Sequence, residues 1–332
     1  MDQYRRALRA GKAAIVCALL FRLWAAGVPE KVLSWLSQPN IAAFLIYLET
    51  GRNVRFSASK EVFLPFAPES PAPLTQTPPE SSPLPVFAPE DTALTELYYA
   101  CDLRPDLETL LSAPLDWTLA AEAPTVLILH THTTESYTQL GEGYVETSDY
   151  RTLDENYNML SIGAHVAKIL SENGIGVVHD RKLHDYPSYN GSYNDARSSI
   201  EQYLSEFPGI QLILDLHRDA ADTGNGQLRT LAQVDGQTAA QLMLVMGTDA
   251  SGLTHENWQE NLSLGLKLQA QLERQAPGIT RPTVLRAQRF NQDLHPGALL
   301  VEVGAAGNSH GEALLAAEVL AQAILALSKG TQ

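Results

Sequence analysis

Residues 125–135 read TVLILHTHTTE, an apolar, partly β-branched run that passes directly into histidine, threonine and glutamate. A short apolar run of this kind is typical of a buried strand in a parallel sheet. In sheets of that class, ligands bind at the carboxyl ends of the strands. The stretch therefore predicts a central strand and a functional site immediately after it.

Further apolar runs alternate with segments of helical periodicity along the rest of the chain. We expect strands at 175–178, 210–216, 241–247 and 299–303, and helices at 158–170, 195–207, 261–275 and 312–327. Strands that alternate with helices predict an α/β fold. The expected architecture is a mainly parallel or mixed sheet that helices cover on both faces.

The composition excludes several classes of protein. The 332 residues include 38 acidic and 23 basic side chains, which gives a formal net charge of −15. So acidic a chain has little with which to neutralise phosphates, and we expect no nucleic-acid partner. Two cysteines exclude a disulfide-dense scaffold and a four-cysteine metal site. A metal site must therefore use histidine and carboxylate side chains.

The N-terminal segment differs from the rest of the chain. Its first twelve residues carry four basic side chains, and an apolar run of about 16 residues follows, interrupted by Arg22. A basic flank before an apolar run is typical of a signal peptide or a signal anchor. We expect an uncleaved single-pass membrane anchor with its N-terminus inside the cell. Cleavage near residues 25–27 and a buried soluble helix are the alternatives.

A proline-rich segment follows this predicted anchor. Nine of the chain's 19 prolines lie within residues 65–89. Proline fixes φ and removes backbone donors, so the segment is expected to be an extended spacer. The predicted organisation is then 1–50 for the basic tip, the anchor and a membrane-proximal apolar segment, 51–91 for an extracytoplasmic linker, and 92–332 for a catalytic domain.

Three of the predicted strands bring polar residues to the same edge of the sheet. His132 and Glu135 follow the first strand, His217 follows the third, and Glu302 lies within the fifth. A catalytic zinc takes three protein ligands, typically histidine and glutamate, and leaves one position to water. We expect His132, Glu135 and His217 to bind Zn²⁺. Glu302 follows an apolar run, and a carboxylate there suits a general base.

Other polar residues near this edge leave choices open. Glu155, at the start of the helix after the first strand, is the alternative to Glu135 as carboxylate ligand. Arg218 either binds a substrate carboxylate by a bidentate contact or forms a structural ion pair with a neighbouring aspartate. Residues 186–193 lack an apolar period, and the loop either lines a substrate groove through Tyr189 and Asn190 or is a simple turn.

Four ordered blocks carry a family resemblance: ILHTHTTESY at 128–137, YPSYNGSY at 186–193, LDLHRDA at 214–220 and LVEVG at 300–304. Together with the anchor and linker, they resemble the stage II sporulation protein P family from about residue 124 to the C-terminus. The resemblance implies an amidase-like or zinc-exopeptidase-like fold. It implies His132, Glu135 and His217 as metal ligands and Glu302 as the base. Amidases more often take the carboxylate ligand from the following helix, which argues for Glu155, whereas zinc carboxypeptidases argue for Glu135.

The same resemblance implies a function. Members of the family are similar to N-acetylmuramoyl-L-alanine amidases. These are zinc enzymes that cleave the amide between N-acetylmuramic acid and the stem peptide of peptidoglycan. The family is also credited with cross-link endopeptidase activity. The implied role is septal wall thinning and engulfment in sporulation, alongside the sporulation proteins D and M. The implied location is the intermembrane space of the sporangium. A non-catalytic wall-binding tether and a zinc carboxypeptidase acting on stem peptides stay open as alternatives.

Overall fold

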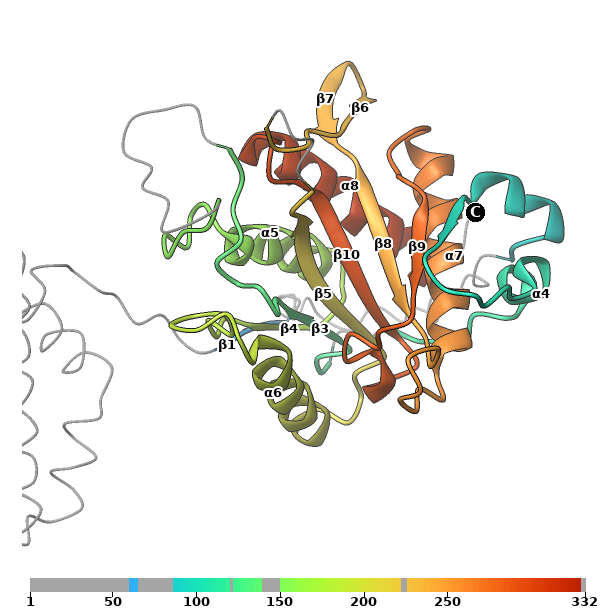
Figure 1. The fold of residues 1–332 in the computed structure, drawn as a ribbon, viewed down its shortest axis with the longest axis horizontal. Helices are drawn as coiled ribbons and strands as arrows, with labels where there is room; N and C mark the ends of the chain where they lie inside the picture. Colours follow the sequence, from blue (N-terminus) through green and yellow to red (C-terminus); the bar gives the residue numbers. More distant parts are fainter. Residues whose placement is uncertain (1–59, 65–85, 120–121, 139–149, 222–225, 330–332) are drawn as a thin grey trace, which may run out of the picture. The chain divides into compact units, whose positions relative to one another are not determined.

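The computed structural model describes residues 60–64, 86–119, 122–138, 150–221 and 226–329. Its main feature is an eight-stranded sheet in the order β1-β4-β3-β5-β10-β8-β9-β2 (Figure 1). The described residues form one compact unit. The predicted membrane anchor lies outside the described residues, as do most of the prolines of the predicted linker.

Four parallel strands form the block that carries the predicted site. They are β4 (Val177–Asp180), β3 (Val126–Leu129), β5 (Leu212–Asp219) and β10 (Ala298–Ala305), and each overlaps a strand expected from the sequence. All four are almost fully buried, as continuous apolar runs in a covered parallel sheet should be. The register pairs Glu302 of β10 with His217 of β5.

The remaining strands make the sheet mixed. β8 (Leu242–Gly247) runs antiparallel to β10, and β9 (Thr283–Arg286) and β2 (Leu97–Tyr99) extend the sheet parallel to β8. At the other edge, β1 (Lys60–Phe63) pairs antiparallel with β4. β1 lies inside the range predicted as linker, ahead of the first proline of that range, where nothing prevents ladder pairing.

One face of the sheet is covered by α5 (Met159–Glu172), α7 (Trp258–Gln275) and α8 (His310–Lys329). The short α4 (Leu107–Ser112) packs on α7. Among the described helices, α8 alone is long and apolar enough to cross a membrane. It is mostly buried against α5 and α7 instead, as a core helix.

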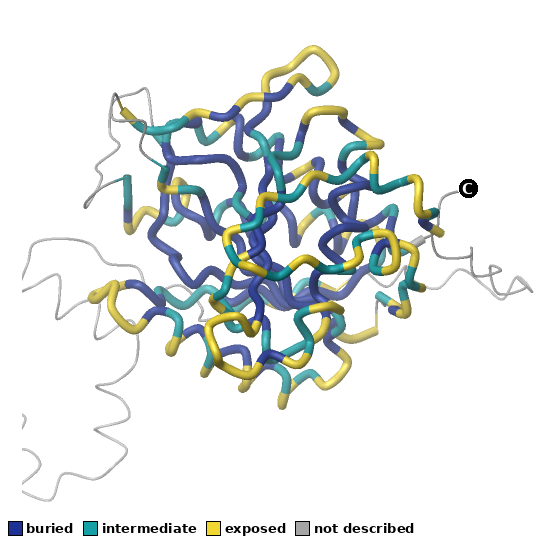
Figure 2. The backbone as a smooth tube through the Cα atoms, turned by 45° about the vertical axis from the view of Figure 1, so that its right-hand side comes forward, coloured by how far each residue is buried: buried dark blue, intermediate teal, exposed yellow. Residues whose placement is uncertain are grey.

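The opposite face is covered differently (Figure 1). There α6 (Ser192–Glu206) packs over β3, β4 and the start of β5. A smaller apolar cluster from β8, β9 and β10 lies beside it, with Phe290 against it. Figure 2 shows the buried backbone of the sheet between the two partly exposed outer layers. Asp215 and His217 of β5 and Glu302 of β10 lie on this α6 face, whereas Arg218 alternates to the other one.

The shorter elements complete the unit. The 3-10 helices η1 (Pro89–Leu94) and η2 (Gln292–Leu294) lie before β2 and before β10, and the hairpin of β6 (Leu231–Val234) and β7 (Gln237–Ala240) projects beyond α8 in Figure 1. Residues 92–119 form the first part of the predicted catalytic domain. The structure uses them to add the edge strand β2 and to cover α7 with α4.

Candidate active site

The turn after β3 is held by its own threonine residues. Thr131 donates hydrogen bonds from its backbone N–H and its hydroxyl to the Asp215 carboxylate on β5, at 2.8 and 2.6 Å. Thr134 donates in the same way to Asp185 in the loop after β4, at 3.1 and 2.7 Å. Thr131 and Thr134 therefore fix this turn to β5 and to the loop after β4, because buried hydroxyls and N–H groups must find partners.

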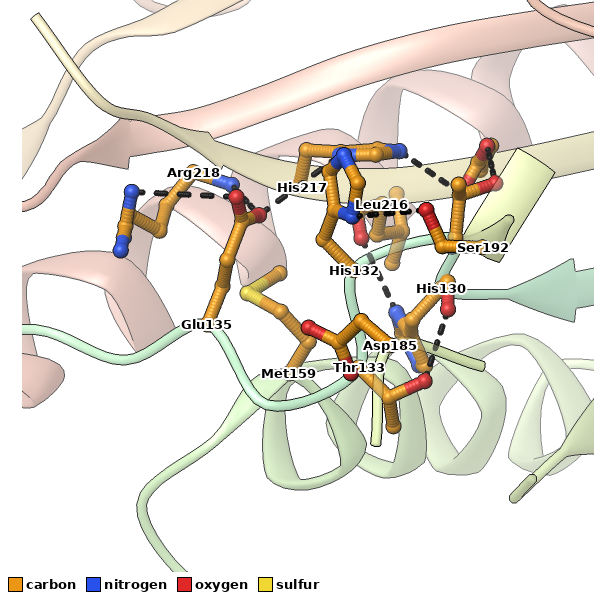
Figure 3. Close-up of polar contacts among 12 residues, drawn as sticks. His130, His132, Thr133, Glu135, Met159, Asp185, Ser192, Leu216, His217 and Arg218 are labelled. Carbon is orange, nitrogen blue, oxygen red and sulfur yellow. Dashed lines mark hydrogen bonds and ion pairs between the residues drawn. The ribbon is translucent and has the colours of Figure 1, made fainter. Parts of the chain in front are cut away.

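Glu135 lies at the centre of a cluster of charges (Figure 3). The backbone N–H of Arg218 donates to its Oε2 at 3.2 Å, and Arg151 donates to its Oε1 at 3.2 Å. His217 Nδ1 lies 3.6 Å from Oε2. Burial alone would raise the pKa of this carboxyl, but Arg218 and His217 outweigh burial and hold the pKa well below its usual range. Glu135 is thus an ionised, fixed carboxylate beside His217.

His217 is bracketed by two carboxylates. Its Nε2 lies 2.9 Å from Asp215 Oδ1, at ion-pair distance but outside hydrogen-bond geometry. Burial would lower the pKa of His217, yet Asp215 and Glu135 raise it well above the ordinary value. Asp215 and His217 stand two residues apart on β5, so they share one face of the sheet. A carboxylate beside a histidine is the arrangement that orients metal-binding imidazoles in other proteins.

His132 lies next to His217, with the two ring centroids 5.2 Å apart and the rings nearly perpendicular. Its Nε2 is 3.1 Å from the Tyr189 hydroxyl, and its Nδ1 is 3.3 Å from Ser192 Oγ. Tyr189 also stacks on the ring, at 4.5 Å between centroids. Burial lowers the pKa of His132 to about 4, so the ring is neutral near pH 7.

Glu302 faces this cluster from β10. Its Oε2 is buried and has no hydrogen-bond partner. Burial raises the pKa of Glu302 to about 8, although the positive charge of His217 opposes that rise. The neighbouring strand position is fixed by Tyr137, whose hydroxyl donates to the Val303 carbonyl at 2.8 Å. A buried carboxyl with an unused oxygen is the type of group that takes up and releases protons in catalysis.

The residues fit zinc in their chemistry. Two histidines and a glutamate are a common catalytic zinc set, and His132, Glu135 and His217 are neighbours here. The buried Glu302 Oε2 lacks a hydrogen-bond partner, as an atom that faces a ligand does. As they stand, no three His, Cys, Asp or Glu side chains of the described ranges are arranged to hold a metal ion. Both ring nitrogens of His132 face hydroxyl groups.

The other predicted residues have different surroundings. Glu155 pairs with Arg181 at 2.5 Å, and Arg181 also pairs with Glu61 of β1. That contact turns Glu155 toward the β1–β4 edge of the sheet. Asn190 is exposed in the loop after β4, where its carbonyl accepts from Ser188 at 3.4 Å.

Arg218 is oriented by the loop that follows β3. It donates to the carbonyls of Ser136 and Tyr150, at 3.0 and 2.9 Å, and its Nη1 lies 3.7 Å from Glu135. Neither neighbouring aspartate is its ion-pair partner, since Asp219 pairs with Arg281 at 2.7 Å. The guanidinium therefore holds the Glu135 loop.

Two parts of the site were missed by sequence reasoning. Asp215 had a usable signal, because Asp-x-His on a strand places both side chains on one face. Arg151 had none: it reaches Asp185 at 2.5 Å and lies over the Tyr189 ring at 4.8 Å, contacts between separate loops. Such contacts depend on how the loops meet in space.

A second pair of histidines lies on the other face of the sheet, toward α5. His130 Nδ1 donates to the Leu216 carbonyl at 3.0 Å, so its Nε2 accepts from His179 Nε2–H at 2.9 Å. Burial lowers the pKa of His130 to about 4 and that of His179 well below its usual value. Gly163 of α5 makes room for both rings, because a Cβ there would lie 2.5 Å from His130. This pair links three strand ends behind the site.

Comparison with known families gives a clear match. The family model for Stage II sporulation protein P (SpoIIP) matches residues 77–325. The stage II sporulation protein P of Bacillus subtilis (strain 168) is 28% identical over 207 residues, which cover 59% of this chain and 49% of that protein. The chain thus spans about half the length of the curated relative that it matches.

Several solved structures are also similar, at lower sequence identity than the Bacillus subtilis relative. They include an N-acetylmuramoyl-L-alanine amidase from Clostridium difficile 630 (17% identity, TM-score 0.35, 63% of this chain and 99% of that one) and the amidase Ami1 from Mycobacterium smegmatis (13%, TM-score 0.38, 63% and 99%). The CwlD amidase from Clostridioides difficile, in complex with the GerS lipoprotein, has 16% identity and a TM-score of 0.36 over 62% of this chain and 95% of that one.

Proposed function

We propose, because this chain belongs to the stage II sporulation protein P family, that it is a zinc-dependent peptidoglycan hydrolase. Its reaction is cleavage of the amide between N-acetylmuramic acid and the L-alanine of the stem peptide, with peptide cross-links as a further substrate. The observation that carries the proposal is the half-buried Glu302 beside the His217–Glu135 pair, because its buried Oε2 has no hydrogen-bond partner.

In this proposal His132, Glu135 and His217 hold the zinc ion, which would supply a water that is easily deprotonated at neutral pH. Glu302 accepts a proton from the attacking water and passes it to the leaving amine. A bound cation lowers the pKa of a neighbouring carboxyl, which brings Glu302 from about 8 toward the range of a working base.

The surrounding residues prepare these groups. Asp215 orients the His217 ring through its close contact at Nε2. Arg151 and Arg218 fix the Glu135 carboxylate in its ionised form. We favour Glu135 over Glu155 as the carboxylate ligand, because Glu135 lies beside His217 whereas Glu155 is paired with Arg181.

The loop after β4 suits a substrate groove. Tyr189 is exposed and stacks beside His132, and Tyr186 is exposed in the same loop. Aromatic rings with polar tips bind sugar rings and peptide groups through stacking and hydrogen bonds. We assign Tyr189 and Asn190 to this groove. Arg218 is left to position Glu135, since loop carbonyls orient it.

The remaining parts of the proposal concern location and partners. A membrane anchor within residues 1–50, followed by the proline-rich segment, would hold the catalytic domain outside the membrane, in the intermembrane space of the sporangium. Peptidoglycan is the substrate there, and the sporulation proteins D and M are the partners that the family implies. These assignments support a role in septal wall thinning during engulfment.

One observation favours a second candidate function. His132 is covered by Tyr189 and Ser192, and the described residues hold no assembled metal cluster. A tether that binds the wall and recruits other hydrolases needs no metal. A zinc carboxypeptidase gains no such support, because the basic residue that it needs for a terminal carboxylate, Arg218, is bonded to loop carbonyls.

The test uses the full chain in detergent and measures zinc content and peptidoglycan products together. Chelator-sensitive release of stem peptides from the glycan, identified by mass spectrometry, is the expected result. His217→Ala and Glu135→Gln should lose zinc, whereas Glu155→Gln and the exposed control Glu318→Gln should keep it. Zinc loss in Glu155→Gln but not in Glu135→Gln would reassign the ligand. Tight wall binding without zinc or cleavage would establish the tether.

A further inference from the structure

A cavity of about 660 Å³ lies far from the catalytic residues. It opens between α4, the loop at 113–118, the first turns of α7 and residues 295–297. Its lining includes Gln211 and Gly297, which directly precede β5 and β10. The catalytic residues lie at the other ends of these strands. At the rise per residue of a strand, that is roughly 15–20 Å away. His295 also lines the cavity.

The inner wall of the cavity is apolar. Trp117 and Leu264 are buried there, and other apolar side chains complete the lining: Leu110, Leu115, Pro114 and Pro296. A volume of this size accommodates a small molecule or a few side chains of a peptide.

Most polar groups in the lining already have partners inside the protein. Thr118 N–H donates to Gln211 Oε1 at 2.6 Å, and Ser263 donates to the Leu110 carbonyl at 2.7 Å. His295 Nδ1 accepts from the Gly297 N–H at 3.0 Å. These groups hold the walls in place and contribute little to recognition of a ligand.

The side chain of Gln259 and two carboxylates are the exceptions. Asp116 and Glu260 line the cavity at exposed positions, and neither has a hydrogen bond or ion pair to any part of the chain that the structure describes. The cavity therefore combines a buried apolar wall with an unpaired negative rim. This combination matches Lys and Arg residues beside apolar ones, because their stems lie along apolar surface while their charged heads stay in water.

We propose that this cavity is a second binding site, which takes a segment of a partner protein with apolar side chains flanked by Lys or Arg. The juxtaposition that carries the proposal is the apolar wall of Trp117 and Leu264 beside the carboxylates of Asp116 and Glu260. The net charge of −15 adds attraction for a basic segment. The site shares no residue with the catalytic cluster, so a docked partner leaves that cluster open.

The test measures binding of labelled peptides to the full chain in a zwitterionic detergent. The probes are three acetylated, amidated peptides, Leu-X-Bpa-Leu, in which X is Lys, Gln or Glu and Bpa is the photo-crosslinker p-benzoylphenylalanine. We expect the Lys peptide to bind at least fivefold more tightly than the Gln peptide, with the Glu peptide weakest. Binding of the Lys peptide should weaken as salt rises, because exposed charges are screened. Crosslinks should map to residues 110–118, 259–264 and 295–297.

The variants separate this site from general charge effects. The double change Asp116→Asn with Glu260→Gln should bring the Lys peptide to the affinity of the Gln peptide. The matched control, Asp235→Asn with Glu318→Gln, removes the same charge from exposed positions elsewhere and should change nothing. Ala113→Phe fills the cavity and should weaken all three peptides. Equal affinity for the Lys and Glu peptides, crosslinks outside the three segments, or no binding by any peptide would overturn the proposal. Binding is the readout, so failure of the hydrolase assignment leaves this result interpretable.

Discussion

The two faces of β5 and β10 differ although they belong to the same strands. Leu216 and Val301 point into the core under α5, α7 and α8, and both are fully buried. Their immediate neighbours, His217 and Glu302, point to the α6 face and meet in register. Around these positions one face is therefore apolar packing, and the other carries titratable groups that are partly or wholly withdrawn from water.

The apolar face stabilises the fold, whereas the polar face carries the reactive groups. Apolar burial stabilises a fold by roughly 25 cal/mol per Å², whereas a buried carboxyl without a partner costs free energy. Asp215 is compensated by two hydrogen bonds from Thr131, but Glu302 Oε2 is not compensated. An uncompensated polar group in an otherwise well-packed sheet is characteristic of a functional site.

The first prediction concerns the polar face and has the largest expected effect. Glu302→Gln should lower peptidoglycan hydrolysis about 10²–10⁴-fold, because an amide cannot take up the proton. Zinc content should stay unchanged. The free energy of unfolding should stay unchanged or rise, since the new side chain is neutral. The measurement is product release together with denaturant unfolding, with Glu318→Gln as control. Retained turnover would remove Glu302 from the mechanism.

The second prediction concerns the apolar face, at Leu216, the residue directly before His217. Leu216→Ala should lower the free energy of unfolding by about 2–5 kcal/mol, through lost burial and a cavity. Leu231→Ala, at an exposed position of the β6–β7 hairpin, should stay within about 0.5 kcal/mol of the parent. Urea unfolding of both variants decides the matter. Equal effects would show that burial on this face does not carry the stability.

The third prediction concerns the histidines on the apolar face. Gly163→Ala should lower the free energy of unfolding by about 1–3 kcal/mol, because its Cβ would press on the His130–His179 pair. The matched change Gly311→Ala in α8 meets no atom within 4 Å and should be neutral or stabilising by up to about 1 kcal/mol. Thermal unfolding distinguishes the two. A stabilised Gly163→Ala would mean that this histidine pair is not packed against α5.

The last prediction concerns the pH dependence of stability, which changes little per pH unit. Between its ordinary pKa of 4.5 and the folded value of about 8, Glu302 holds a proton in the folded state that the unfolded state has released. Stability from this group is therefore lost as the pH rises through that window, by at most about 1.4 kcal/mol per unit. The difference between parent and Glu302→Gln, measured from pH 5 to 8 with a chelator, isolates it. Parallel curves would contradict the raised pKa.

The sequence alone determined the central part of the fold. The four parallel strands and helices α5 to α8 follow from apolar runs and helical periodicity, which are local patterns that burial imposes on each element. The same patterns led from the strand ends to His132, Glu135, His217 and Glu302. These residues lie close together because the carboxyl ends of parallel strands share one edge of the sheet.

The remaining features depend on contacts between distant parts of the chain. The reversed direction of β8 and the short strands β1, β2 and β9 depend on pairing with neighbours rather than on a strong pattern of their own. The difference between Glu135 and Glu155 depends on their partners, because Arg151 and Arg218 surround one while Arg181 pairs with the other. The cavity at the opposite edge arises where α4, α7 and the start of β10 meet. Contacts of this kind join residues far apart in the chain, so no local stretch of sequence encodes them.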